Sequence, residues 1–180
     1  MTKTAYYGFT GAIEPATATR IAAALNHAVN QGYEEIYLCL SSTGGYVADG
    51  LYLYNHIRGL PVKVTINNTG TVMSIATAIY VSAEVRHCSR HGIFMLHPTQ
   101  MPAINSSMQA EQLQSALTAA LADDQRTEDI LRERAGIPEA TLNDRLFKEV
   151  YITANQAVEF GLAHDIVEFA LPEGDEIIQI

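Results

Sequence analysis

The sequence predicts an α/β fold in which short buried strands alternate with helices. Residues 35–40, Glu-Ile-Tyr-Leu-Cys-Leu, are mostly apolar, as in strands that are buried on both faces of a parallel sheet. A Gly-Gly turn follows them, and apolar side chains then recur at helical spacing over residues 47–58. Residues 62–66 repeat the strand pattern with β-branched side chains. Strand, turn and helix in this order predict parallel βαβ units.

The first helix is expected before these units, over residues 15–30. Ile21, Leu25 and Val29 recur every four residues there, and Gly32 follows as a stop signal. The other elements expected in the first half are a turn at residues 67–70, a helix over residues 70–80, and strands at residues 85–89 and 93–96.

The second half of the chain predicts a long helix, over about residues 105–135, that projects from the α/β body as a handle. Ser106 and Gln109 have the spacing of a capping box. A stripe of leucines follows on one face, at Leu113, Leu117 and Leu121. Such a stripe suits a contact between subunits, and it equally suits packing on the chain's own core. Further expected elements are a helix at residues 138–148, a short helix at residues 154–160 capped by Thr153, and a strand at residues 165–169.

Composition predicts one globular domain over residues 1–180 and excludes several classes of function. Hydrophobic residues make up 48% of the chain and charged residues 17%. The formal net charge of −9, without any run of Lys or Arg, argues against nucleic-acid binding. Cys39 and Cys88 are expected to be buried thiols and not a disulfide framework. No signal peptide or membrane-spanning run is present, so a cytoplasmic protein is expected.

Three features predict where chemistry could occur. Gly44 and Gly45 stand between a strand and a helix, where exposed backbone N–H groups can stabilise an oxyanion. Ser74, in Gly-Thr-Val-Met-Ser-Ile-Ala, lies near the start of a helix, which exposes its hydroxyl. His97 ends an apolar strand and supplies the base that a serine needs in order to become a nucleophile. Each feature taken alone is more often structural than catalytic.

The order of these features resembles that of the Clp protease proteolytic subunit, a family of the same superfamily as the crotonases. "IYLCLSSTGGYVADGLYLYNHI" resembles its strand, Gly-Gly turn and helix, and "GTVMSIA" resembles its G-x-A-A-S-M-G nucleophile motif. "FMLHPT" resembles its M-I-H-Q-P, and "YITANQAVEFGLAHDIV" resembles its F-x-S-A-x-E-A-x-E-Y-G-L-V-D. The likeness extends from about residue 7 to residue 167 and implies the family's repeated β-β-α units.

The resemblance implies a serine endopeptidase without a cofactor that cleaves peptides or unfolded proteins inside a ring-shaped chamber. Ser74 corresponds to the nucleophile and His97 to the general base, and the N–H groups of Gly45 and Ile75 correspond to the oxyanion hole. The family also implies seven-membered rings stacked face to face, a tetradecamer held together through the handle helix.

The position that corresponds to the family's third catalytic residue departs from the family pattern. Counting back six positions from Tyr151 places the family's aspartate at Arg145, and Asp144 is the adjacent acid. Asp144 is therefore the candidate, although neighbouring residues on a helix point about 100° apart. A backbone carbonyl could orient His97 instead, or Arg145 could turn toward a carboxylate of a neighbouring subunit.

Two further departures concern partners and substrate. Few residues precede Tyr6, where the family carries a longer leader, and this argues against an AAA+ unfoldase partner. "TQMPAIN" lacks the family's Gly pair after the histidine, which weakens the expected substrate-holding strand.

The alternatives come from two other classes of protein. One is a non-catalytic, ring-forming relative, favoured by Arg145 and by the short leader. The other is an acyl-CoA enzyme of the crotonase fold, against which the joint presence of Ser74 and His97 counts. No metal site is expected, because His87 and His91 straddle a turn without an acidic or cysteine partner at ligand spacing.

Overall fold

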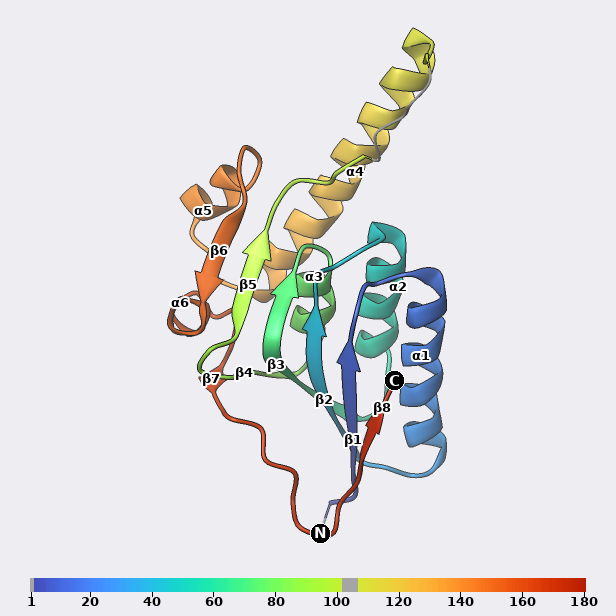
Figure 1. The fold of residues 1–180 in the computed structure, drawn as a ribbon, viewed down its shortest axis with the longest axis vertical. Helices are drawn as coiled ribbons and strands as arrows, with labels where there is room; N and C mark the ends of the chain where they lie inside the picture. The colour runs from blue at the N-terminus through green and yellow to red at the C-terminus, as the bar shows by residue number, and fades with distance from the viewer. Residues whose placement is uncertain (1, 102–106) are drawn as a thin grey trace.

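The computed structural model describes residues 2–101 and 107–180, and its elements alternate as the sequence predicts (Figure 1). The helices are α1 (Pro15–Asn30), α2 (Val47–Arg58), α3 (Ala76–Val81), α4 (Ala110–Arg134), α5 (Glu139–Asp144) and α6 (Ala154–Glu159). The strands are β1 (Thr4–Thr10), β2 (Glu35–Ser42), β3 (Lys63–Met73), β4 (Val85–Cys88), β5 (Ile93–Leu96), β6 (Val150–Thr153), β7 (Asp165–Ile166) and β8 (Ile177–Gln179).

The described strands form one sheet with the order β6-β5-β3-β2-β1-β8. β3 is long enough to pair with two strands in succession: its first half pairs with β4 and its second half with β5. β4 pairs in turn with β7. All of these pairs are parallel except β5–β6, which is antiparallel. Because parallel strands need crossover connections, the helices between them pack on the sheet and enclose the core.

The core lies between the sheet and the layer formed by α1, α2 and α3, which lie side by side (Figure 1). On α1, the side chains of Ile21 and Leu25 are buried, as the four-residue spacing predicts. α3 is buried at every position from Ala76 to Val81, which explains why its sequence shows no amphipathic period. This layer places the N-terminal end of α3, and the residue before it, inside the molecule.

Helix α4 projects away from the α/β body, as predicted (Figure 1). Its described part begins at Ala110, after Gln109, whose N–H donates a 2.9 Å hydrogen bond to the side chain of Gln112. The predicted capping residue Ser106 lies outside the described residues. Leu131, near the other end of the helix, is fully buried against the body. Only the C-terminal part of α4 is therefore anchored to the core among the residues described.

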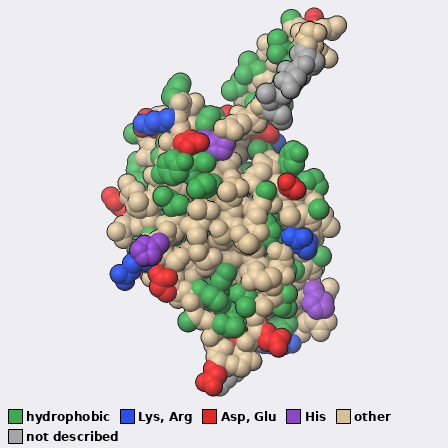
Figure 2. All heavy atoms as spheres, in the orientation of Figure 1, with side chains coloured by type: hydrophobic (Ala, Val, Ile, Leu, Met, Phe, Trp, Pro, Cys, Tyr) green, Lys and Arg blue, Asp and Glu red, His purple; other side chains and the backbone are tan. Residues whose placement is uncertain are grey.

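The leucine stripe of α4 is solvent-exposed in the single chain. Leu113, Leu117 and Leu121 are 55%, 53% and 59% exposed. Figure 2 shows hydrophobic side chains along the projecting helix. The chain's own core thus leaves this face uncovered. The sequence allowed two interpretations of the stripe, a contact between subunits or packing on the chain's own core, and the second does not hold for these leucines.

The turn predicted at residues 67–70 is wrong, because β3 runs through it to Met73. Asn67 and Asn68 are both fully buried in this strand. The Asn67 side chain donates to the Tyr37 hydroxyl and to the carbonyl of Val167, and that of Asn68 donates to the carbonyl of Ile93. Asparagine usually favours turns because its side chain bonds to nearby backbone. Here tertiary partners accept from the side-chain NH2 groups, and the strand continues.

Smaller differences concern the second half. The helix predicted at residues 138–148 ends at Asp144, and the strand predicted at residues 165–169 is limited to β7. Thr153 caps α6 as expected, accepting a hydrogen bond from the N–H of Gln156. Among the described residues, no helix is long and apolar enough to cross a membrane.

Candidate functional site

Ser74 occupies a strained turn between β3 and α3. Its φ is +54°, and it is the only non-glycine residue with positive φ in the described ranges. Its N–H donates a 2.8 Å hydrogen bond to the carbonyl oxygen of Met95 on β5, which holds the turn against the neighbouring strand. A non-glycine residue in this region costs on the order of 1–3 kcal/mol, and such strain concentrates at functional sites. The turn presents the serine side chain to a pocket, although Ser74 precedes α3 and is not one of its residues.

The Gly44-Gly45 turn approaches Ser74 closely, and side chains would not fit there. A Cβ atom on Gly44, whose φ is +90°, would lie 2.7 Å from the Cβ of Ser74. A Cβ atom on Gly45 would lie 2.0 Å from the carbonyl oxygen of Ile13. Two backbone hydrogen bonds of 2.8 Å, from Ile13 N–H to Gly44 O and from Tyr46 N–H to Ile13 O, fix the turn. The glycines are therefore required by packing against the serine and the loop before α1.

The predicted oxyanion donors flank the serine. Gly45 and Ile75 both line the pocket that contains Ser74. Neither N–H donates a hydrogen bond to another described residue. Backbone N–H groups that point into a site and lack a partner are what an oxyanion hole needs.

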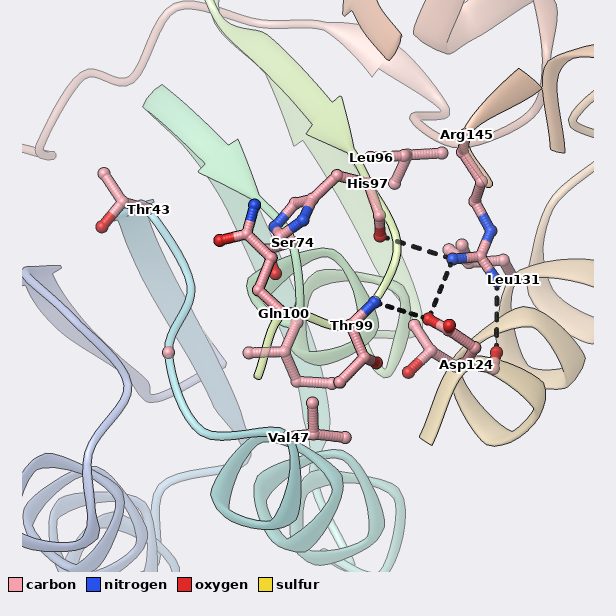
Figure 3. Close-up of a pocket in the computed structure, with 13 residues that line it drawn as sticks. Thr43, Val47, Ser74, Leu96, His97, Thr99, Gln100, Asp124, Leu131 and Arg145 are labelled. Carbon is pink, nitrogen blue, oxygen red and sulfur yellow. Dashed lines mark hydrogen bonds and ion pairs between the residues drawn. The ribbon is translucent and has the colours of Figure 1, made fainter. Parts of the chain in front are cut away.

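His97 follows the last residue of β5 and lines the same pocket, which has a volume of about 280 Å³. In Figure 3 its ring lies beside Ser74. Its Nδ1 atom is buried without a hydrogen-bond partner in the described part of the chain. No hydrogen bond joins its ring to the Ser74 hydroxyl among the described residues, a geometry common in unliganded enzymes. The structure thus brings the predicted nucleophile, base and glycine turn together.

The structure does not bring Asp144 to this pocket. Asp144 is the last residue of α5, and its carboxylate forms a 2.7 Å ion pair with Lys148 at the surface. Its side chain is 56% exposed. The choice of Asp144 as an acid beside His97 has no support in this geometry, because the helix turns that side chain away from the pocket while its neighbour Arg145 points inward.

Arg145 is buried at the edge of the pocket, with only 2% of the residue exposed. Its guanidinium donates to the carboxylate of Glu128 at 2.9 Å and lies 3.7 Å from that of Asp124. Both acids belong to α4 of the same chain. Within the single chain the charge of Arg145 is therefore already compensated, so it does not require a carboxylate of a neighbouring subunit.

Glu149 is an acid close to His97 in the strand register that the sequence analysis did not consider, and it is not among the residues that line the pocket. β5 and β6 are antiparallel, with Leu96 opposite Val150, so continuing this register by one residue places Glu149 opposite His97. Directly opposed residues on an antiparallel pair direct their side chains to the same face of the sheet. The carboxylate of Glu149 is exposed and accepts a 2.7 Å hydrogen bond from the Tyr151 hydroxyl. Recognising β6 as a partner of β5 would have been the signal for this position.

The comparisons with known proteins agree with this architecture. A family model described as Clp protease matches residues 2–170. The chain is 25% identical over 173 residues to the ATP-dependent Clp protease proteolytic subunit 2 of Pseudomonas aeruginosa, covering 91% of this chain and 83% of that one. It is 26% identical over 136 residues to proteolytic subunit 3 of Rhizobium etli, covering 74% and 69%.

The fold is also similar to that of a solved structure, the ClpP1 N165D mutant from Listeria monocytogenes. The TM-score is 0.79, with 20% sequence identity, and the match covers 93% of this chain and 92% of that one. At this identity the likeness concerns the fold alone. The family model, which spans most of the sequence, decides the assignment: the chain belongs to the Clp protease family.

Proposed function

We propose that the chain acts as a serine endopeptidase of the Clp type, with Ser74 as nucleophile and His97 as general base. The observation that carries this proposal is the single pocket shared by Ser74, His97, Gly45 and Ile75. A second cavity of about 320 Å³ adjoins it and shares Gly45 with it. Two connected cavities suit an extended peptide whose side chains occupy sites on either side of the bond that is cleaved.

In the proposed reaction the Ser74 hydroxyl attacks the carbonyl carbon of the peptide bond while its proton passes to the His97 imidazole. The negative charge that develops on the carbonyl oxygen is stabilised by the N–H groups of Gly45 and Ile75. The imidazolium then protonates the leaving amine, and an acyl-Ser74 ester remains. Water, deprotonated by His97, hydrolyses this ester and frees the serine.

For the third residue we propose Glu149 in place of Asp144. The β5–β6 register supports this choice: its last pair is Leu96 with Val150, and the next residues along the two segments are His97 and Glu149. A carboxylate beside the imidazole fixes its tautomer and stabilises the imidazolium. In the unliganded chain the Tyr151 hydroxyl holds this carboxylate, so the proposal requires that contact to be exchanged for one with His97.

The proposal extends to assembly: one peptidase domain per chain, joined through α4 into two stacked rings of seven with the sites facing an interior chamber. The exposed leucines of α4 support the contact between rings, since a patch of this kind on a projecting helix needs a partner. An enclosed chamber in the cytoplasm would confine cleavage to peptides and unfolded chains.

The second candidate is a non-catalytic ring component with the same fold. Two observations favour it: Arg145 occupies the inward-facing position after α5, and Ser74 makes no hydrogen bond to His97 among the described residues. This candidate would form the same rings but would not cleave peptides.

Covalent labelling with a fluorophosphonate probe separates the two candidates. The peptidase predicts stoichiometric labelling of the wild-type chain and none of Ser74→Ala. Ser82→Ala is the matched control, because Ser82 is buried at the end of α3 and does not line the pocket. Absence of labelling in a folded wild-type protein, together with intact oligomers, would instead establish the non-catalytic candidate.

A further inference from the structure

Arg145 has the largest side chain among those fully buried in the described structure, yet the proposed chemistry does not use it. Its guanidinium has four acceptors in reach, and three of them belong to α4: the Glu128 carboxylate at 2.9 Å, the Asp124 carbonyl at 3.1 Å and the Asp124 carboxylate at 3.7 Å. The fourth is the main-chain carbonyl of His97, at 3.4 Å. Arg145 therefore bridges the projecting helix to the backbone of the candidate base (Figure 3).

A second contact fastens the same segment to the same helix. The N–H of Thr99 donates a 2.7 Å hydrogen bond to the Asp124 carboxylate. Pro98 stands between the two attached residues and has no N–H of its own. The segment 97–99 is thus attached to α4 at both ends, through Arg145 at the His97 carbonyl and through Asp124 at the Thr99 amide.

The side chain of His97 has no comparable attachment. Its Nδ1 atom is buried without a partner in the described residues. In this state the position of the imidazole relative to Ser74 follows from the position of its main chain. On the other side of the pocket, Ser74 is fixed to β5 by its N–H bond to the Met95 carbonyl, two residues before His97.

Stability by itself is a weak reason to keep this arginine. A buried ion pair is often replaceable by apolar side chains of similar volume at little or no cost, because burial of the charges offsets their attraction. An apolar side chain, however, could not donate a hydrogen bond to the His97 carbonyl. Nor could lysine span acceptors on two elements, since it lacks the planar fork of the guanidinium.

We propose that Arg145 is a positioning residue, which sets the distance between His97 and Ser74 by tying the main chain of His97 to α4. This inference rests on the proposed peptidase function. It predicts that catalysis depends on how α4 is seated on the body. Displacing a catalytic group by about 1 Å costs about 10²-fold in rate.

The test compares Arg145→Met, Arg145→Lys and Arg132→Met in the full chain. Arg132 is the matched control: it also pairs with Glu128, at 2.7 Å, but it lies at the surface and has no contact with His97. Arg145→Met is expected to slow fluorophosphonate labelling of Ser74 and kcat for a peptide about 10²-fold, with KM little changed. For Arg132→Met, the labelling rate and kcat are expected to stay within about threefold of the wild-type values. Arg145→Lys, which retains a cation and keeps the test open if the Met variant fails to fold, is expected to keep the melting temperature while remaining slow.

Amide hydrogen exchange gives a reading that does not depend on activity. Arg145→Met and Arg145→Lys are expected to speed exchange in the segment 94–99, and Arg132→Met is not. If wild type carries no label but this exchange pattern holds, the peptidase function fails and the structural tie stands. The proposal is overturned if both Arg145 variants label and exchange at the wild-type rates. It is also overturned if Arg132→Met slows labelling and kcat as much as Arg145→Met does.

Discussion

The main-chain N–H of Ser74 donates a 2.8 Å hydrogen bond to the carbonyl oxygen of Met95, two residues before His97. This bond crosses from the end of β3 to β5 and sets the turn that holds Ser74 at φ +54°. Because β3 and β5 are parallel neighbours, both residues reach the same edge of the sheet. The candidate nucleophile and base are thus placed by strand pairing, before any contact between their side chains.

The approach of Gly44 to Ser74 predicts that Gly44→Ala is more harmful than its backbone angle alone explains. Gly44 and Gly174 both have φ +90°, but only Gly44 has atoms within contact of an added Cβ. Gly174→Ala, the control, should cost roughly 1 kcal/mol of backbone strain. Gly44→Ala should cost about 1–3 kcal/mol more through overpacking, and should abolish labelling of Ser74. Urea unfolding and probe labelling measure the two effects; equal losses of stability in both variants would contradict the crowding account.

The β5–β6 register predicts different outcomes for two acids near the site. Glu149→Gln should lower kcat by orders of magnitude, up to the ~10⁴-fold seen when a triad aspartate is replaced. Asp144→Asn should change kcat less than about threefold, since that carboxylate pairs with Lys148 at the surface. Peptide cleavage by both variants, with oligomer size checked by light scattering, decides between them. A severe loss in Asp144→Asn with none in Glu149→Gln would restore the assignment made from sequence.

The exposed leucines of α4 predict that the assembly depends on this helix. Replacing Leu113, Leu117 and Leu121 together by serine should reduce the particle mass at micromolar concentration, because the apolar contact is lost, while the circular dichroism of the chain remains unchanged. Ser115→Lys is the control, since its exposed side chain lies about 200° around the helix from Leu113. A wild-type protein that is already monomeric by light scattering would rule out the interface.

The His87 imidazole predicts a loss of stability in mild acid. Burial lowers the pKa of His87 below its usual value, with Lys63 adding to the effect and Asp165 opposing it. The unfolded chain therefore binds the proton more readily, so the free energy of unfolding falls as pH drops below about 6.5. His87→Gln should flatten this part of the pH dependence. Tyr37→Phe is the control: it removes the 3.4 Å contact to Nδ1 and the hydroxyl that accepts from Asn67, but it leaves the His87 imidazole half-buried, so the stability can fall without a change in the acid slope.

Urea unfolding between pH 7.5 and pH 5 measures these slopes. An identical acid slope in His87→Gln and wild type would show that other groups carry the pH dependence.

The sequence by itself determined the secondary structure that depends on local periodicity. α1 spans the predicted residues 15–30, since Ile21 and Leu25 repeat on one face and Gly32 ends the pattern. The leucine spacing also predicted the projecting helix. Motif order predicted that Ser74, Gly45 and His97 lie near one pocket, because strand ends in a parallel sheet converge. These features depend on residues that are close in the chain or on the topology of βαβ units.

Only the tertiary structure decided the features that depend on partners distant in the chain. Asn67 and Asn68 continue a strand in which Tyr37, Val167 and Ile93 accept hydrogen bonds from their side-chain NH2 groups. No local pattern contains those partners.

The surroundings of the candidate acids also depend on the tertiary structure. Arg145 and Asp144 are adjacent in sequence, yet one is buried against α4 and the other pairs with Lys148 at the surface. Glu149 became a candidate only through the antiparallel register of β5 and β6. Counting along a chain cannot fix such relations, because an insertion or a change of helix phase redirects a side chain, whereas strand pairing fixes which residues face one another.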